Sequence, residues 1–274
     1  MGALGFHLFS HFVPYYGFMI VIGIMAAAGI AYVQVKRFHL DWNDFVILSA
    51  MSGLFGMAGA KILYLLISIH TIDFTRLNDL SYIGMLMSGG FVFYGGFLGI
   101  FPALYFCRKK FKIHVSEYLQ YGTGCIPIVH GFGRIGCHLV GCCHGIPYNG
   151  RFAVIYSNSL YAPNDIRLFP VQLLEAFGEF MIGFYLLYSC KRRNGASAIA
   201  MYMVLYSIMR FFLEYLRGDS VRGSFYLFST SQVISIVVFV IGLLTIVREK
   251  HKKDGVCFIR GGILGDGSDI PKGR

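Results

Sequence analysis

Residues 16–35 read YGFMIVIGIMAAAGIAYVQV, an apolar run without a single charged side chain. A helix needs roughly 20 largely apolar residues to cross the hydrocarbon core of a bilayer. Further apolar runs follow along the chain, so the sequence predicts an all-α, polytopic membrane protein. We expect about seven transmembrane helices, at approximately residues 16–35, 45–69, 86–106, 117–140, 170–190, 196–216 and 229–247.

The composition of the chain also indicates a membrane protein. Of its 274 residues, 56% are hydrophobic and only 14% are charged, whereas a soluble domain carries about 25% charged residues. The net charge of +10 lies in short basic clusters between apolar runs, so we expect no nucleic-acid partner. The length predicts one transmembrane helical domain over residues 1–253. The Gly-rich, charged segment 254–274 is expected to be a disordered cytoplasmic tail.

The basic clusters predict an orientation in the membrane. Cytoplasmic loops carry an excess of Lys and Arg, and most of the 24 basic residues fall on one side of the expected helices. We therefore place the N-terminus outside and the C-terminus in the cytoplasm. Residues 141–169 then form a small extracytoplasmic head that contains several turn sequences. The residues of the cytoplasmic clusters are Lys36, Arg37, Arg108, Lys109, Lys110, Lys112, Lys191, Arg192, Arg193, Arg248, Lys250, Lys252, Lys253, Arg260, Lys272 and Arg274.

Charged side chains inside the expected helices are candidates for a functional site, because each costs about 2.5 kcal/mol or more in a bilayer. Arg210 and Glu214 are four residues apart, so they share a helix face and can form an ion pair. Such a pair either serves a site or only joins two helices, and both interpretations stay open. The full set is Lys61, Arg134, Glu175, Glu179, Arg210 and Glu214.

Arg134 lies among glycines, in His130-Gly131-Phe132-Gly133-Arg134-Ile135-Gly136. Glycines let another backbone or a ligand approach closely, and a guanidinium offers a planar fork that matches a phosphate. A phospholipid headgroup supplies a phosphate at this depth, so we interpret Arg134 as a phosphate ligand. The alternative is an arginine whose side chain extends to the membrane interface.

A cluster of cysteines and histidines follows directly, in Cys137-His138-Leu139-Val140-Gly141-Cys142-Cys143-His144-Gly145. These residue types bind zinc or copper, although the spacing differs from that of paired CxxC knuckles. Two other interpretations stay open. Cys142 and Cys143 can form a redox-active vicinal disulfide, or the thiols act only as small packing residues.

Together these segments resemble the prolipoprotein diacylglyceryl transferase family. The glycines and the arginine of that family's signature match Gly133, Arg134, Gly136, Gly141 and Gly145. Other motifs match in the same order within residues 13–248, and Gln232 and Ser235 match in the last helix. These motifs are Tyr15-Tyr16-Gly17, Ser88-Gly89-Gly90-Phe91-Val92-Phe93-Tyr94-Gly95-Gly96-Phe97-Leu98-Gly99, Pro170-Val171-Gln172-Leu173-Leu174-Glu175 and Arg210-Phe211-Phe212-Leu213-Glu214-Tyr215-Leu216-Arg217.

The resemblance implies an enzyme of lipoprotein biosynthesis in the bacterial inner membrane. The family moves a diacylglyceryl group from phosphatidylglycerol to the lipobox cysteine of a preprolipoprotein. The thiolate is the nucleophile, and preorganised cations stabilise the leaving phosphate. The implied partners are phosphatidylglycerol, the preprolipoprotein signal peptide and membrane lipids, with no metal or organic cofactor.

The resemblance also implies roles for individual residues. Three of them depart from the family's pattern. Tyr94 occupies the position of a histidine in the family, Cys137 that of an asparagine and Cys142 that of a glutamate. A phenol is a poor base near neutral pH because its pKa is about 10, so His138 or His144 is expected to take over proton transfer. The implied catalytic residues are Tyr94, Arg210, Glu214, His138 and His144; the implied substrate-binding residues are Arg134, Tyr16, Gln172, Glu175, Cys137, Cys142 and Gly145.

Other functions remain open at this point. A divergent paralogue would use another acceptor in place of the lipobox thiol. A transporter or channel would line a path with the intramembrane charges. A membrane metal or thiol-redox protein would be built on the cluster from Cys137 to His144.

Overall fold

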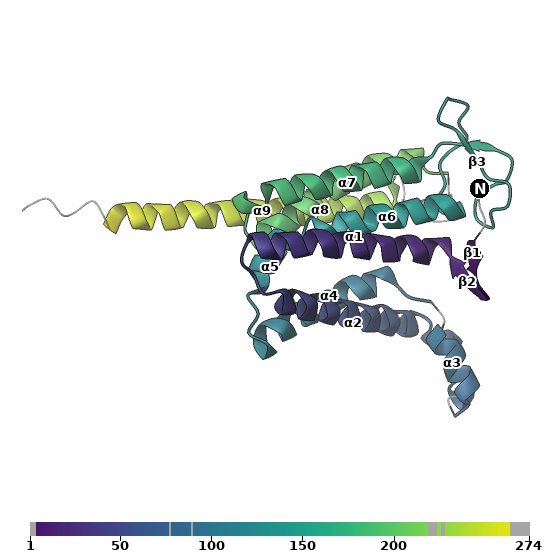
Figure 1. Cartoon of the computed structure of the whole chain (residues 1–274), viewed down its shortest axis with the longest axis horizontal. Coiled ribbons are helices and arrows are strands. Elements are labelled where there is room, and N and C mark those ends of the chain that lie inside the picture. The colour runs from purple at the N-terminus through teal and green to yellow at the C-terminus, as the bar shows by residue number, and fades with distance from the viewer. Residues whose placement is uncertain (1–3, 77, 89, 219–223, 226–227, 264–274) are drawn as a thin grey trace, which may run out of the picture. The chain divides into compact units, whose positions relative to one another are not determined.

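The computed structural model describes residues 4–263, except residues 77, 89, 219–223 and 226–227. The chain is mostly helical (Figure 1) and divides into two compact units. The large unit consists of Met1–Gln34 and Leu119–Arg274, and the small unit consists of Val35–Tyr118. The functional site described below lies within the large unit.

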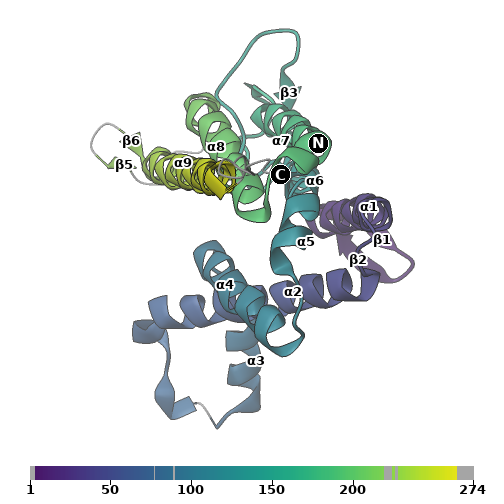
Figure 2. The same cartoon turned by 90° about the vertical axis from the view of Figure 1, so that its left-hand side faces the viewer.

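Among the described residues, the large unit contains a group of long helices and three short hairpins. Its helices pack in sequence, α6 against α7, α7 against α8 and α8 against α9 (Figure 2). The hairpins pair β1 with β2, β3 with β4 and β5 with β6, each antiparallel. The elements are β1 Gly5–Leu8, β2 His11–Pro14, α1 Tyr15–Arg37, α5 Val115–Gly122, α6 Cys125–Val140, β3 Val154–Ile155, β4 Arg167–Leu168, α7 Val171–Ser189, η3 Cys190–Arg192, α8 Gly195–Leu213, η4 Glu214–Leu216, β5 Ser224–Phe225, β6 Phe228–Ser229 and α9 Thr230–Ile263.

The small unit is built around one helix pair, α2 (Trp42–Ile67) and α4 (Phe93–Lys110). Two short 3-10 helices, η1 (Ile69–Thr71) and η2 (Phe74–Arg76), and the helix α3 (Leu80–Ser88) connect them. The loop ends of this pair enclose a small core of buried Leu48, Cys107, Ile113 and Tyr118.

Within the described residues, five helices are long and apolar enough to cross a membrane, namely α1, α2, α7, α8 and α9. The shorter apolar helix α6 adds a sixth apolar segment. The predicted helical, polytopic membrane fold is therefore confirmed, and the hairpins are a minor addition to it. The division into domains and the nature of the tail stay predictions: α9 continues to Ile263, and residues 264–274 lie outside the described residues.

Two of the expected spans differ from the structure by a break or by a later start. The span expected at 117–140 consists of two helices, because α5 ends at Gly122 and α6 begins at Cys125. The span expected to begin at residue 86 begins as a continuous helix only at Phe93. Glycine costs about 1 kcal/mol in a helix relative to alanine, and both breaks fall at glycine-containing segments.

Glycines allow α2 and α4 to pack closely. A Cβ atom added at Gly59 would lie 2.4 Å from the carbonyl oxygen of Gly95, and one added at Gly99 would lie 2.2 Å from that of Phe55. Small residues of this kind let membrane helices approach each other, where van der Waals packing drives their association. The glycine-rich start of α4 is therefore a helix-packing surface.

Replacing Gly59 by alanine is expected to destabilise this helix pair by about 1–3 kcal/mol, because the added methyl group overpacks the interface. The measurement is thermal unfolding of the purified protein in detergent. Gly53→Ala is the matched control, since it lies on the same helix and a Cβ atom there meets nothing within 4 Å. Equal stability of the two variants would contradict the packing role.

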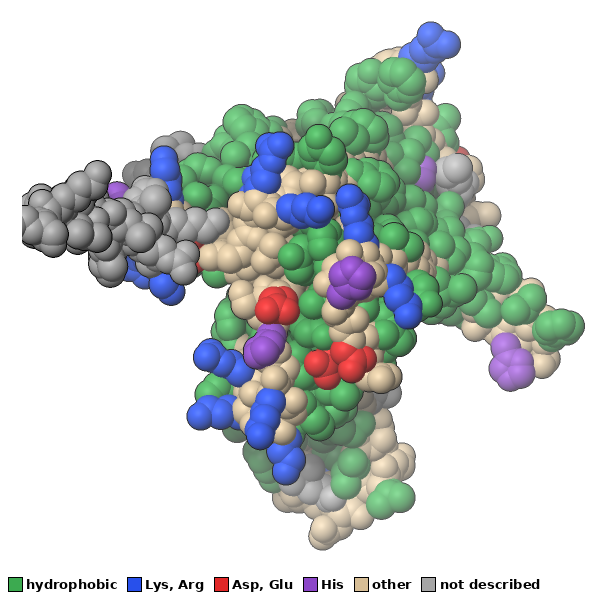
Figure 3. Space-filling view, turned by 60° about the vertical axis from the view of Figure 1, so that its left-hand side comes forward, with side chains coloured by type: hydrophobic (Ala, Val, Ile, Leu, Met, Phe, Trp, Pro, Cys, Tyr) green, Lys and Arg blue, Asp and Glu red, His purple; other side chains and the backbone are tan. Residues whose placement is uncertain are grey.

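Large hydrophobic side chains cover the outer surfaces of the helices. On α7 and α8, for example, Phe177 is 63% exposed, Phe184 is 58% exposed and Phe212 is 63% exposed. Broad hydrophobic areas appear in green in Figure 3, with Lys and Arg side chains in blue beside them. Soluble proteins rarely expose contiguous apolar surface on this scale, so these faces suit contact with lipid chains.

The head segment between α6 and α7 has its own small core of Tyr156, Ala162 and Leu168, around the hairpin of β3 and β4. Ser159 Oγ donates to the carbonyl oxygen of Val140 at 2.9 Å, which ties this core to the end of α6. The helix itself ends at Gly141, whose φ of 88° is the left-handed conformation typical of a helix C-terminus.

Candidate active site

An ion pair and a histidine–carboxylate contact join α6 to α7 in the interior of the large unit. His130 Nδ1 lies 2.6 Å from Glu179 Oε1, and Arg134 Nη2 lies 3.0 Å from Glu175 Oε1. His130 and Arg134 are four residues apart on α6, and Glu175 and Glu179 are four apart on α7, so each helix presents one polar face to the other. Glu175 and Glu179 are 1% and 0% exposed, and carboxylates buried in this way need such partners.

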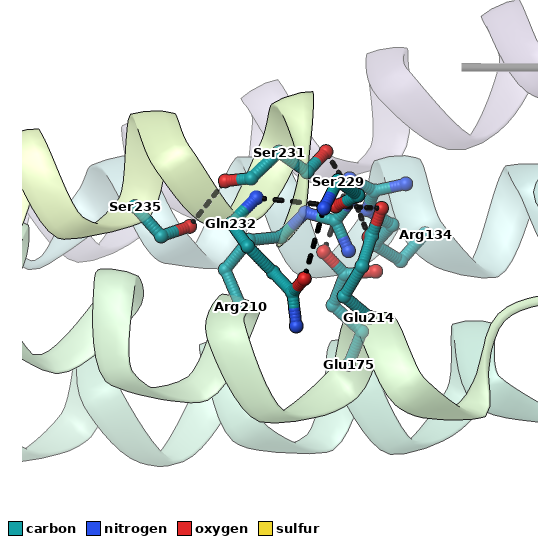
Figure 4. A network of polar contacts seen from close by, with 8 residues as sticks. All are labelled: Arg134, Glu175, Arg210, Glu214, Ser229, Ser231, Gln232 and Ser235. Atoms are coloured by element: carbon teal, nitrogen blue, oxygen red, sulfur yellow. Dashed lines mark hydrogen bonds and ion pairs between the residues drawn. The ribbon is translucent and has the colours of Figure 1, made fainter. Parts of the chain in front are cut away.

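A second network joins α8 to the start of α9. Arg210 Nη2 lies 2.7 Å from Glu214 Oε2 and donates to Ser231 Oγ at 2.9 Å. Ser229 Oγ donates to the other oxygen of Glu214 at 2.8 Å. Figure 4 shows these side chains in one view with Arg134 and Glu175, and Tyr206 of α8 interacts electrostatically with both arginines, so both belong to the same polar interior. The expected ion pair between Arg210 and Glu214 is confirmed.

The start of α9 is fixed by a reciprocal cap. The Gln232 backbone N–H donates to Ser229 Oγ at 3.2 Å, and the Ser229 backbone N–H donates to Gln232 Oε1 at 3.0 Å. This is the capping box, in which two otherwise unpaired helix-end donors are satisfied. It holds the Ser229 hydroxyl where it can contact Glu214, and thereby orients the carboxylate that pairs with Arg210.

Three buried donor atoms in this interior have no hydrogen-bond partner among the described residues. They are Arg134 Nε, Arg210 Nη1 and Gln232 Nε2. A buried donor without a partner costs free energy comparable to a lost hydrogen bond, about 1–3 kcal/mol. The interior is therefore prepared for a ligand with several acceptor oxygens, and a phosphate ester is such a ligand.

Tyr206 of α8 connects the two networks. Its hydroxyl interacts electrostatically with Arg134 and Arg210 and with Glu175 and Glu179, and its ring lies 5.5 Å from that of His130. Tyr206 and Arg210 are four residues apart, as are Arg210 and Glu214, so the polar face of α8 continues over several turns.

Three thiols gather beside this interior, at the end of α6. The sulfur atoms of Cys137, Cys142 and Cys143 all lie within 4.8 Å of one another. Contacts with Cys137 and Cys142 lower the pKa of the Cys143 thiol, and the nearby Arg217 and Arg134 act in the same direction. Cys143 has a φ of 57°, a left-handed conformation that is uncommon for residues other than glycine.

Tyr16 at the start of α1 borders the thiols. Its Cα atom would lie 3.1 Å from a Cβ atom added at Gly136, so the glycine lets α1 approach α6 here. The phenol interacts electrostatically with Cys137 and with Arg134. Tyr16 is 48% exposed, so it lies at an accessible edge of the site.

His138, Gln172 and Tyr156 form a buried group between the site and the head. Gln172 Nε2 donates to the Cys142 carbonyl oxygen at 3.0 Å and to the Tyr156 hydroxyl at 3.5 Å. Burial raises the pKa of Tyr156 to about 12, so its phenol stays protonated and can donate to His138 Nδ1, 3.3 Å away. This contact orients the His138 ring.

His144 and Gly145 pair with the segment that follows α8. The Gly218 N–H donates to the His144 carbonyl oxygen, and the Ile146 N–H donates to that of Leu216, both at 3.0 Å. A Cβ atom at Gly145 would lie 2.3 Å from the Phe169 carbonyl oxygen, so glycine is required by close packing. The His144 Nδ1 atom lies 3.1 Å from the Gly145 carbonyl oxygen.

A model of the prolipoprotein diacylglyceryl transferase family matches residues 4–248, which include every residue of this site. The chain belongs to this family. It is similar to the phosphatidylglycerol–prolipoprotein diacylglyceryl transferase of Clostridium tetani, with 33% identity over 90% of this chain and 98% of the relative. It is also similar to transferase 2 of Clostridium perfringens, with 34% identity over 84% of this chain and 88% of that protein. It is 27% identical to the phosphatidylglycerol–prolipoprotein diacylglyceryl transferase of Acinetobacter baumannii, over 90% of this chain and 92% of that protein.

The expectation that the chain is a member of this transferase family is thus confirmed, and with it the enzyme class. The residue roles inferred from the resemblance stay predictions. The structure brings most of these residues together in the large unit: Tyr16, Arg134, Cys137, His138, Cys142, Gln172, Glu175, Arg210 and Glu214. Tyr94 lies in the first turn of α4, in the small unit, and its side chain is outside the described residues.

Several residues of the site were not predicted from the sequence of this transferase family member. His130 contacts Glu179, Ser229 contacts Glu214 and Ser231 contacts Arg210. The Tyr206 ring lies against that of His130. The usable signal was the spacing of four residues, which runs from His130 to Arg134 and from Tyr206 through Arg210 to Glu214. Polar residues repeated at this interval mark the inner face of a membrane helix.

Proposed function

We propose that this chain transfers a diacylglyceryl group from phosphatidylglycerol to the lipobox cysteine thiol of a preprolipoprotein. The observation that carries the proposal is the pair of buried arginines. Arg134 and Arg210 are each held by one carboxylate, and each keeps a buried N–H without a hydrogen-bond partner among the described residues. These donors suit the phosphate ester of a lipid headgroup.

The two arginines have different parts in the proposed reaction. Arg134, oriented by Glu175 at 3.0 Å, binds the phosphate of phosphatidylglycerol. Arg210, held by Glu214 and Ser231, stabilises the negative charge that develops on the leaving phosphate oxygen. Preorganised donors of this kind act most strongly in a site that excludes water. The carboxylates balance the guanidinium charges before the lipid arrives.

The acceptor thiol is proposed to reach the glyceryl carbon from the side of Tyr16 and Gln172. Tyr16 is 48% exposed beside the thiols, and Gln172 is fixed to the Cys142 carbonyl oxygen. The sulfur electron pair forms the new bond to carbon, the bond from carbon to the phosphate oxygen breaks, and glycerol phosphate leaves. The thiol proton balances the new charge on the phosphate.

A direct assay tests the proposal. The purified chain is incubated with phosphatidylglycerol labelled in its acyl chains and with a lipobox peptide. We expect the label on the peptide as a thioether and stoichiometric release of glycerol phosphate. A peptide with serine in place of the lipobox cysteine is the control. Absence of transfer from correctly folded protein, together with failure to complement a strain depleted of its own transferase, would contradict the proposal.

The proposed orientation places the C-terminus in the cytoplasm and the head, residues 141–169, outside. The basic residues at the end of α7 support it. In the large unit, the Asn194 side chain that caps α8 also contacts Glu249 of α9. The basic residues Lys191–Arg193 and Arg248 therefore lie at the same end of these helices. A fluorescent protein fused to the C-terminus is expected to fluoresce, because the proposed orientation places it in the cytoplasm. Alkaline phosphatase fused at the same position is expected to be inactive. The opposite pair of results would reverse the orientation.

A further inference from the structure

The three thiols at the end of α6 form a compact group that the proposed arginine chemistry does not use. Cys137 is buried, and Cys142 and Cys143 are half-buried. The turn at Gly141 reverses the chain, so that residues five and six positions apart meet. Cys142 Sγ lies 3.8 Å from the Cys137 carbonyl oxygen, and this weak hydrogen bond links the turn back to the end of α6.

The spacing of the sulfur atoms suits one metal ion. Zn–S bonds of about 2.3 Å place the sulfur atoms of a tetrahedral site about 3.8 Å apart. Here all three lie within 4.8 Å of one another, so closing around an ion needs only a small rotation of the side chains. Three thiolates carry three negative charges against the two positive charges of one Zn²⁺, so the three-ligand site keeps one negative charge.

The group offers three protein ligands and not four. Among the described residues, no histidine or carboxylate joins the three thiols in a metal-sized group. His138 Nδ1 contacts the Tyr156 hydroxyl, and His144 Nδ1 contacts the Gly145 carbonyl oxygen. Structural zinc sites are closed by four protein ligands, whereas catalytic sites have three and keep a fourth position open.

We propose that Cys137, Cys142 and Cys143 bind one Zn²⁺ ion, with the fourth position open to the thiolate of the acceptor peptide. This inference rests on the proposed function, because it assigns a partner to that position. It also revises the expectation that no metal is needed. Zinc deprotonates a thiol that coordinates it, which is what the acceptor cysteine requires before it attacks carbon.

The step balances without any further reactant. The peptide thiol replaces water on the ion and its proton passes to solvent. The sulfur then forms its bond to the glyceryl carbon, and the carbon–oxygen bond to the phosphate breaks. The phosphate oxygen keeps that electron pair, and the proton released at the start balances the glycerol phosphate. The neutral thioether binds zinc less strongly than the thiolate and leaves.

Cobalt replacement tests the site independently of activity. The full-length protein, purified under reducing conditions, is stripped of metal and titrated with Co²⁺. We expect one ion per chain, a sulfur-to-cobalt charge-transfer band, and a change in the visible bands on addition of a lipobox peptide. A peptide with serine for the lipobox cysteine is expected to leave the visible bands unchanged. Zinc is expected to displace cobalt.

Single replacements of Cys137, Cys142 or Cys143 by serine are expected to weaken binding by at least about 100-fold, since loss of even an outer partner of a metal ligand costs about 10–100-fold. Cys125→Ser is the matched control, because Cys125 is a buried cysteine on the same helix. It is expected to bind cobalt like the parent. Weak binding in Cys125→Ser would show that a disturbed helix, and not ligand loss, explains the other variants.

The outcomes separate this inference from the proposed function. Transfer by a protein that binds neither cobalt nor zinc would overturn the metal site and leave the transferase intact. One bound cobalt with no response to the thiol peptide would overturn the open position. Selective binding of Cu⁺ alone, or a disulfide that persists after reduction, would also overturn the site. Metal binding with a peptide response, but no transfer from phosphatidylglycerol, would support the site and contradict the proposed lipid donor.

Discussion

Replacing Arg134 by lysine is expected to lower kcat/KM for diacylglyceryl transfer by about 100-fold or more. Loss of one preorganised donor to a developing anion costs about 100–1,000-fold in other enzymes. Lysine keeps the charge beside Glu175 but loses the planar fork, including the buried Nε that has no hydrogen-bond partner among the described residues. The measurement is the rate of thioether formation at several phosphatidylglycerol concentrations.

A matched substitution separates this effect from general loss of an arginine. Arg193→Lys changes an arginine whose guanidinium contacts the Tyr185 hydroxyl at 2.8 Å and the backbone of Ser189. It is expected to keep nearly full activity. Unchanged transfer by Arg134→Lys, with the same content of folded protein, would remove Arg134 from the phosphate site. Replacement by alanine is less informative, because it leaves Glu175 as an unpaired buried charge at a cost of about 3–5 kcal/mol.

Replacing Arg210 by lysine is expected to lower kcat by about 100-fold with a smaller change in KM. A group that acts mainly on the transition state affects kcat more than substrate binding. The guanidinium reaches both Glu214 and Ser231 through Nη2, and its Nη1 has no partner among the described residues. A lysine ammonium cannot reproduce this fork. The measurement is a full rate profile against lipid concentration.

Two further variants define the Arg210 result. Ser231→Ala removes one neutral partner of Arg210, worth about 1 kcal/mol, and is expected to reduce the rate roughly 5-fold. Arg167→Lys is the control, because Arg167 lies in the head and its guanidinium donates to the Gly150 carbonyl oxygen at 3.2 Å. A rise in KM with unchanged kcat for Arg210→Lys would assign Arg210 to lipid binding and not to charge stabilisation.

The membrane fold followed from the sequence because its signals are local. Long apolar runs and clustered basic residues need no knowledge of neighbouring helices. The ion pair of Arg210 and Glu214 was predictable for the same reason, since both residues lie on one helix face. The boundaries of α4 and α6 were less predictable. Glycine lowers the stability of a helix, so helix and turn are close in free energy in the glycine-rich segments.

The arrangement of the site was not predictable from single residues. The pairing of Arg134 with Glu175 and of His130 with Glu179 depends on the register between α6 and α7, which hydropathy does not encode. The three thiols were recognised as a cluster, but their meeting depends on the left-handed turn at Gly141. The role expected for Tyr94 stays a prediction.

The backbone at Cys143 has a consequence for how this protein changes under selection. A residue other than glycine in the left-handed region costs about 1–3 kcal/mol, and Cys143 has a φ of 57°. A variant library sorted only for heat resistance of the metal-free protein is therefore expected to accumulate glycine at position 143. A library sorted for lipoprotein output is expected to keep the cysteine. The difference in the frequency of cysteine at position 143 between the two libraries would measure how much the Cys143 thiol contributes to lipoprotein output.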